Sequence, residues 1–147
     1  MVNQQAGQAN LEVISIVDIL STLSDDKAFI LYNTIALGGG QNFRALIKNM
    51  GITRRQYYSR IFKMTKAGLI RRENATYVTT LLGNVVYKAI SLVGMGLKYY
   101  WVLKAIESFQ APSAINSKEA ISTLIDSLIE DLDIKKILMG PPIASAS

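Results

Sequence analysis

The stretch ITRRQYYSRIFKMTKAGLIRRENATYVTTLLG, residues 52–83, contains the signals of a helix, a hairpin and a second helix in immediate succession. Thr53 and Gln56 have the spacing of a capping box, which predicts that a helix starts at residue 53. Gly68 provides the positive φ with which that helix ends at Ala67. The segments 69–73 and 76–79 then predict two short strands joined at Asn74-Ala75.

The helix predicted over residues 53–67 has two different faces. At 100° per residue, Tyr57, Ile61 and Met64 share one face, which we expect to enter the core. The opposite face collects Arg55, Gln56, Ser59, Phe62, Lys63 and Lys66. Cationic and amide side chains gathered on one side are suited to phosphates and base edges, although a solvated surface is the alternative.

The segments before this stretch complete a helix-turn-helix spacing. Asn42 is predicted to cap a helix over 43–50, and Gly51 falls where a helix end requires positive φ. Ser24, followed by two aspartates, predicts the start of a helix over 25–37 that ends at Gly38-Gly39-Gly40. Apolar spacing predicts a helix over 11–23, with a strand as the alternative.

The segments after the stretch are predicted to be helical and rich in apolar residues. Thr80 is expected to cap one long helix over 81–110, in which Gly94-Met95-Gly96 marks a bend or a close helix crossing. After a break at 111–113, a helix over 118–131 is capped by Ser117 or Asn116, and Asp133 caps a last turn over 134–139.

The long helix is apolar on more than one stripe, so part of it needs a partner beyond its own domain. Trp101 with Tyr99 and Tyr100 would form either a dimer core, which we favour, or the lining of an effector pocket. The residues predicted to join two copies are Val86, Ile90, Val93, Leu97, Tyr100, Trp101, Leu103 and Ile106.

Charge is distributed unevenly along the 147 residues, whose net charge is +5. Between Gln41 and Arg72 there is no acidic residue, whereas acids predominate between Glu107 and Asp133. A basic block inside one folded unit indicates a polyanion as partner. The basic block consists of Arg44, Lys48, Arg54, Arg55, Arg60, Lys63, Lys66, Arg71 and Arg72.

Composition excludes several classes of function. The chain has no cysteine and no histidine, which excludes thiol chemistry, a Cys/His zinc site and histidine-dependent catalysis. No pair of acids, activated nucleophile or phosphate loop has a workable spacing, so we predict no catalytic residue, metal or cofactor, and no enzyme activity. The sequence shows neither a signal peptide nor a membrane span, which predicts a cytoplasmic protein.

These features together predict a mainly α fold with a small β-hairpin. The expected organisation is a disordered N-terminus over 1–10 and a winged helix-turn-helix domain over 11–80. A helical dimerisation region over 81–139, formed by the long helix and a short helical tail, and a flexible tail over 140–147 follow.

The run AGLIRRENATYVTTLLG, residues 67–83, resembles the winged-helix transcriptional regulators of the MarR, ArsR and PadR kind, in particular small archaeal ones. The likeness covers about residues 20–93 and consists of a helix closing on Gly-Leu-Ile, a basic wing and Tyr-x-x-Thr-x-x-Gly. This chain departs from the pattern in having Ile47 where a small residue is usual, a short wing, and no metal-binding Cys or His.

The resemblance implies a homodimer that binds double-stranded DNA sequence-specifically, with helix 53–67 in the major groove and wing 69–79 on the backbone. The alternative is a winged-helix module that binds other proteins of a transcription or chromatin assembly. A small-molecule or protein effector is left unassigned. The residues expected at the DNA are Arg54, Arg55, Gln56, Tyr58, Ser59, Arg60, Lys63, Arg71 and Arg72.

Overall fold

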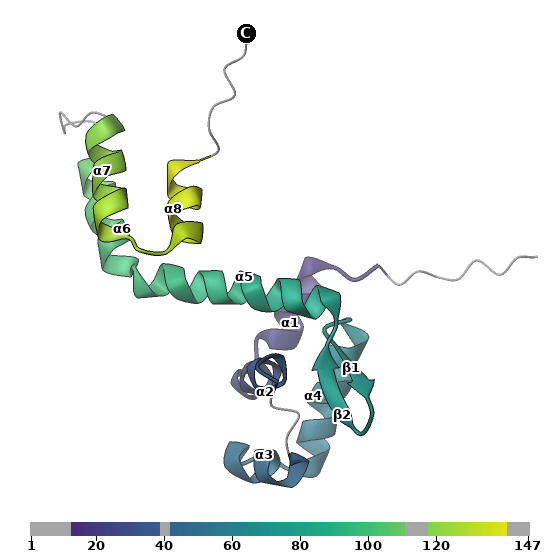
Figure 1. Cartoon of the computed structure of the whole chain (residues 1–147). Helices are drawn as coiled ribbons and strands as arrows, with labels where there is room; N and C mark the ends of the chain where they lie inside the picture. Colours follow the sequence, from purple (N-terminus) through teal and green to yellow (C-terminus); the bar gives the residue numbers. More distant parts are fainter. Residues whose placement is uncertain (1–12, 39–41, 111–117, 141–147) are drawn as a thin grey trace, which may run out of the picture. The chain divides into compact units, whose positions relative to one another are not determined.

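The computed structural model describes residues 13–38, 42–110 and 118–140, and it is mainly α-helical with a two-stranded antiparallel hairpin (Figure 1). This confirms the predicted fold class at that level. The chain divides into two compact units, Met1–Tyr87 and Lys88–Ser147. The predicted disordered N-terminus, the break at 111–113, the caps at 116 or 117 and the tail from 141 lie outside the described residues.

The first unit is formed by four helices, the hairpin and the start of a fifth helix. Two starting points differ from prediction. Ser15 caps α1 in a capping box with Asp18, and Asp25 rather than Ser24 caps α2 because Ser24 ends α1. The elements are α1 (Ile16–Leu23), α2 (Asp26–Ala36), α3 (Phe43–Met50), α4 (Arg54–Lys66), β1 (Ile70–Glu73), β2 (Thr76–Thr79) and the start of α5 (Leu81–Lys98).

The predicted boundaries of α3 and α4 are confirmed in detail. Gly51 ends α3 with φ +61°, a conformation that glycine adopts without a steric penalty. Thr53 then caps α4, with both hydrogen bonds of the capping box to Gln56 present. Gly68 follows α4 with φ +75°. Local chemistry alone therefore sets both ends of α4.

The core of the first unit lies between the helices and the base of the hairpin. Tyr57, Ile61 and Met64 are buried, as their shared face predicted. Burial of these apolar side chains is the main force that holds α4 in place. The buried apolar side chains among the described residues of this unit are Leu23, Ala28, Leu31, Tyr32, Ile35, Met50, Tyr57, Ile61, Met64, Ala67, Leu69 and Ile70.

The hairpin is joined to α5 through Thr80 and Gly83. The strands pair from Ile70 with Thr79 to Glu73 with Thr76, so the hairpin turns at Asn74-Ala75 as predicted. The Thr80 hydroxyl donates to the carbonyl of Gly68 and accepts from Gly83 N at 2.9 Å. A Cβ on Gly83 would lie 2.0 Å from the Leu69 carbonyl oxygen. Glycine at this position therefore lets α5 begin directly against the hairpin.

The second unit contains the rest of α5 and three shorter helices, α6 (Tyr100–Phe109), α7 (Lys118–Leu128) and α8 (Leu132–Met139). The single helix predicted over 81–110 is wrong, because helical structure is interrupted at Tyr99. Gly94-Met95-Gly96 lie inside α5 and do not interrupt it, and the bend or close helix crossing predicted there stays a prediction. Asp131, not Asp133, caps α8.

The second unit has its own apolar core of Ile106, Ile125, Ile129 and Ile134. The Tyr99 hydroxyl accepts a hydrogen bond from Glu130 N at 3.3 Å, which fixes the α6 start relative to the α7 end. Neither a proline nor a glycine occupies the position of the interruption, Tyr99. No helix within the described ranges combines the length and the apolar character that crossing a bilayer requires.

Candidate nucleic-acid interface

The outward face of α4 is a stripe of Arg55, Ser59, Phe62 and Lys66, which we call the outer stripe. These positions fall within about 60° of one another around the helix axis, opposite the buried face. All four side chains are exposed, and Phe62 retains 67% of its surface accessible. Neither Arg55 nor Lys66 forms an ion pair with a carboxylate in the described part of the chain. Burial of the opposite face therefore holds α4 in place and leaves the outer stripe exposed.

An aromatic cluster positions the N-terminal end of α4. The ring of Phe43 lies 4.9 Å from that of Tyr57 and 5.6 Å from that of Tyr58. The Arg54 guanidinium lies 5.5 Å from the centre of the Phe43 ring, a cation–π arrangement. Burial raises the pKa of Tyr57, whereas Tyr58 is 49% exposed. Arg54 and Tyr58 are therefore held at the exposed start of α4.

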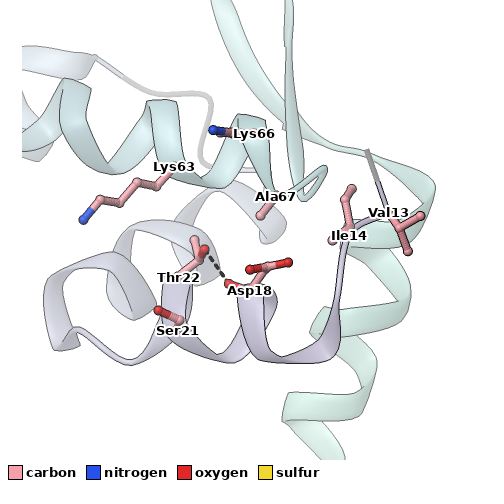
Figure 2. Close-up of a pocket in the computed structure, with 8 residues that line it drawn as sticks. All are labelled: Val13, Ile14, Asp18, Ser21, Thr22, Lys63, Lys66 and Ala67. Atoms are coloured by element: carbon pink, nitrogen blue, oxygen red, sulfur yellow. Dashed lines mark hydrogen bonds between the residues drawn. The ribbon is translucent and has the colours of Figure 1, made fainter. Parts of the chain in front are cut away.

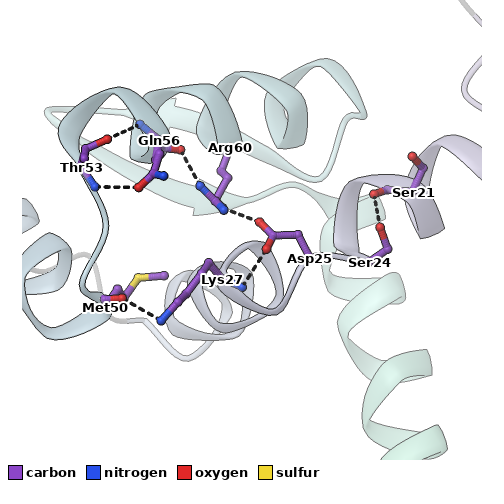
Figure 3. Close-up of polar contacts among 8 residues, drawn as sticks. All are labelled: Ser21, Ser24, Asp25, Lys27, Met50, Thr53, Gln56 and Arg60. Atoms are coloured by element: carbon purple, nitrogen blue, oxygen red, sulfur yellow. Dashed lines mark hydrogen bonds and ion pairs between the residues drawn. The ribbon is translucent and has the colours of Figure 1, made fainter.

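Gln56 is engaged in the fold as well as exposed (Figure 3). Its side-chain oxygen accepts from Thr53 N at 2.9 Å, and Gln56 N donates to the Thr53 hydroxyl at 3.1 Å. A bidentate contact with adenine needs both the oxygen and the NH₂ of a glutamine. With its oxygen in the capping box, Gln56 retains only NH₂ donors for a base edge.

Arg60 is the predicted contact residue most committed to the fold. Its Nε donates to Asp25 Oδ2, and its Nη1 donates to the backbone carbonyl of Gln56 at 3.1 Å, as Figure 3 shows. The guanidinium of Arg60 lowers the pKa of Asp25 through this hydrogen bond. Lys27 Nζ on α2 donates to the Met50 carbonyl at 2.8 Å. A phosphate would have to compete with Asp25 for Arg60.

The two arginines of the hairpin differ in their surroundings. Arg71 forms an ion pair with Glu73 at 2.6 Å, on the same face of β1. Arg72 is exposed opposite Tyr77 in the antiparallel register and has no ion pair among the described residues. Of the two, Arg72 presents the charge that is not already compensated.

A cleft of about 460 Å³ lies between α1 and α4 (Figure 2). Lys63 and Lys66 border it on the α4 side, and Asp18 lies on α1. Hydrogen bonds from the side chain and backbone of Ser15, with a smaller effect of Lys66, lower the pKa of Asp18. The remaining lining residues are Val13, Ile14, Ser21, Thr22 and Ala67.

The exposed cations extend beyond the predicted contact set. Arg44 and Lys48 on α3, and Lys66 on α4, are exposed and have no ion pair with a described carboxylate. The helical period that places Arg55 and Ser59 outward also places Phe62 and Lys66 there. The sequence therefore contained the signal for these two residues, but the predicted contact set omitted them.

The residues predicted to join two copies fall into two groups. Val93, Leu97, Tyr100 and Trp101 are exposed, with exposed fractions of 65%, 69%, 46% and 80%. Ile106 is buried in the core of the second unit and Leu103 packs against it, which accounts for both without a second copy. Val86 and Ile90 are half-buried. In the first unit, α1 exposes Ile16, Val17 and Leu20, an apolar surface absent from the predicted set.

Comparison with protein-family models, with curated proteins and with solved structures found no match for this chain. The geometry of the first unit therefore provides the indication of function. That geometry combines a capped helix with a cationic, partly aromatic outer stripe and an adjacent basic hairpin.

Proposed function

We propose that this chain is a transcriptional regulator that binds double-stranded DNA sequence-specifically as a homodimer in the cytoplasm. In this proposal α3 and α4 form a helix-turn-helix, α4 enters the major groove, and the hairpin serves as a short wing on the sugar–phosphate backbone. Arg55, Ser59 and the NH₂ of Gln56 would read base edges. The residues that would contact phosphates are Arg54, Tyr58, Lys63, Lys66 and Arg72.

The observation that carries the proposal is the set of exposed cations on one rigid support. The two cations of the outer stripe form no ion pair with a described carboxylate, while the opposite face of α4 is held by buried Tyr57, Ile61 and Met64. A rigid cationic face favours phosphates because binding releases condensed counterions from DNA. A rigid helix also places side chains reproducibly against base edges.

The homodimer rests on the exposed apolar residues after the hairpin. Val93, Leu97 and Trp101 leave more than half of each side chain in contact with water. Covering such residues with a second copy would remove apolar surface from solvent, and two-fold symmetry is the commonest arrangement. Two α4 helices related by that symmetry would read half-sites about one helical turn of DNA apart.

The test is selection of bound fragments from a random pool of duplex DNA, with the mass of the protein measured in parallel. The proposal predicts a two-fold symmetric enriched site and a dimeric mass. A chain that enriches no sequence contradicts the proposal. If the protein enriches no DNA sequence but captures a different protein through the exposed apolar residues of α5 and α6, the alternative function, a winged-helix module that binds other proteins, replaces the proposed one.

Two single variants separate base readout from phosphate contact. Arg55→Ala is expected to relax discrimination, since one good bidentate contact contributes about 1–3 kcal/mol between right and wrong bases. Arg72→Ala is expected to weaken binding to all DNA sequences by the same factor and to flatten the dependence of affinity on salt. Unchanged selectivity of Arg55→Ala would remove Arg55 from the base-reading role.

A further inference from the structure

Phe62 is an apolar side chain in the middle of a cationic face. It lies on the outer stripe, one turn after Ser59 and one turn before Lys66, and 67% of it is exposed. Phe43, Tyr57 and Tyr58 form ring contacts with one another, but Phe62 forms none with a described aromatic residue. Phe62 therefore lies outside the aromatic cluster at the start of α4 and contacts no other ring in the described part of the chain.

The residues around Phe62 narrow down what can cover it. Lys63 and Lys66 are both exposed beside it, and Arg55 lies on the same stripe two turns earlier. The centre of a protein–protein interface is depleted in charged side chains, particularly lysine, so an apolar protein surface fits this site poorly. The fitting occupant presents anions around a small apolar group.

The major groove of DNA has this combination. Phosphates line both sides of the groove, and thymine projects its C5-methyl group into it between polar base edges. A phenyl ring contacts such a methyl group favourably because both surfaces leave water. Guanine and adenine instead present acceptors that arginine and amide side chains bind.

We infer that Phe62 is a specificity-determining residue that contacts the C5-methyl group of a thymine in each half-site. The inference rests on the proposed function, since it requires α4 to lie in the major groove. Arg55 and Phe62 are seven residues apart, about 10 Å along the helix axis. Phe62 therefore reads a different base pair from Arg55, about three base pairs away.

The experiment replaces each thymine of the selected site, one at a time and in both half-sites, by deoxyuridine. Deoxyuridine keeps the base pair and removes only the methyl group. Affinity is measured by fluorescence anisotropy at fixed salt for the full-length chain without substitution, for Phe62→Ala and for Phe29→Ala. Phe29 is a 37% exposed phenylalanine on α2, so Phe29→Ala controls for loss of a phenyl ring elsewhere.

The expected result is one sensitive thymine in each half-site. Its replacement lowers the affinity of the full chain about fourfold per half-site, the effect of one methyl-sized group leaving an apolar contact. Phe62→Ala binds the thymine site more weakly and no longer distinguishes thymine from deoxyuridine there. Phe29→Ala distinguishes them as the full chain does. Circular dichroism confirms that both variants are folded.

Two results would overturn the inference while leaving the proposed function intact. In the first, the chain binds its site selectively but tolerates deoxyuridine at every position. In the second, the deoxyuridine effect persists undiminished in Phe62→Ala, which would assign the methyl contact to another residue. A chain that selects no DNA site would instead overturn the proposed function together with the inference.

Discussion

The helix α4 and the segment formed by the end of α5 and α6 leave opposite chemistry exposed. Both bury one side in the core of their own unit, through Met64 in α4 and Ile106 in α6. Outside, α4 exposes Arg55 and Lys66, whereas the α5–α6 segment exposes Leu97 and Trp101. One surface suits an anionic partner and the other an apolar one.

This difference means that contact with DNA and self-association would depend on separate residues. Charge removed from α4 should change DNA affinity without changing the oligomer. Charge introduced on the α5–α6 segment should do the reverse. Substitutions that change either DNA affinity or the oligomeric state, but not both, support this division of roles. Substitutions that change both contradict it.

The largest expected effect is on folding and concerns two glycines of α5. Gly83→Ala would place its Cβ 2.0 Å from the Leu69 carbonyl oxygen, while a Cβ on Gly94 meets no heavy atom within 4 Å. Gly83→Ala is expected to cost about 3 kcal/mol, because a backbone group must move. Gly94→Ala is expected to stabilise by about 0.5–1 kcal/mol through helix propensity.

Urea denaturation of the two variants measures this difference. The hairpin base and the start of α5 would be shown to tolerate a methyl group if Gly83→Ala were as stable as the natural chain. That result would contradict the close approach on which the position of the hairpin depends.

The next effect concerns self-association. Leu97→Glu would bury an uncompensated carboxylate in the proposed dimer interface and weaken association by about 2 kcal/mol. Leu37→Glu, at a residue that is 74% exposed in the first unit, provides the matched control. Analytical ultracentrifugation should show dissociation for Leu97→Glu alone. Equal dissociation constants for both variants would place the dimer interface elsewhere.

A smaller effect separates the two roles of Gln56. Gln56→Ala loses the hydrogen bond to Thr53 N and should cost about 1 kcal/mol. Gln56→Glu keeps that acceptor at the positive end of the helix, so its thermal stability should not fall. Its carboxylate should nevertheless repel phosphates and weaken DNA binding. If Gln56→Glu bound DNA as well as the natural chain, Gln56 would lie outside the interface.

The smallest expected effect concerns the ion pair of Arg60 with Asp25. Because this contact lowers the folded-state pKa of Asp25, its stabilisation is complete above the ordinary value of 3.8 and is lost as pH falls through the lowered value. Loss of the ion pair in Arg60→Ala should cost less than about 1 kcal/mol at pH 7, and this part of the loss should vanish once Asp25 is protonated in both states. Arg44→Ala, which removes an unpaired arginine on α3, should show no such pH dependence.

Chemical denaturation between pH 2 and pH 7 compares these two variants. A stability loss of Arg60→Ala that stayed constant down to pH 2 would contradict the ion pair as its cause. A large loss of DNA affinity at pH 7 in the folded variant would show that Arg60 also serves the interface.

The fold of residues 42–80 was predictable because its signals are local. The left-handed turn at Gly51, the capping box of Thr53 with Gln56, the end of α4 at Gly68 and the hairpin turn each depend on residues within a few positions. The helical spacing of apolar and charged residues also predicted which face of α4 is buried. Local chemistry and helical period therefore give the candidate interface most of its shape.

What the sequence could not show depends on contacts between distant residues. Arg60 and Asp25 are 35 positions apart, so no periodicity marks Arg60 as part of the fold. Tyr32 donates to the carbonyl of Gly83 across 51 positions. The interruption at Tyr99 goes with a contact to Glu130 and not with the glycines of α5. In these three cases residues far apart in the sequence interact, whereas the omitted Phe62 and Lys66 follow from the helical period and could have been predicted.

The central claim, that the exposed face of α4 binds DNA phosphates, is tested most directly by the salt dependence of affinity for the selected site. Lys63→Ala with Lys66→Ala removes two exposed charges from α4, and Lys118→Ala with Lys136→Ala removes two from the second unit. We expect the α4 pair to reduce the slope of log affinity against log salt by about 0.9 per lost contact, about 3.6 in a homodimer. The second-unit pair should leave the slope unchanged. Equal slopes for both double variants and the natural chain would contradict it.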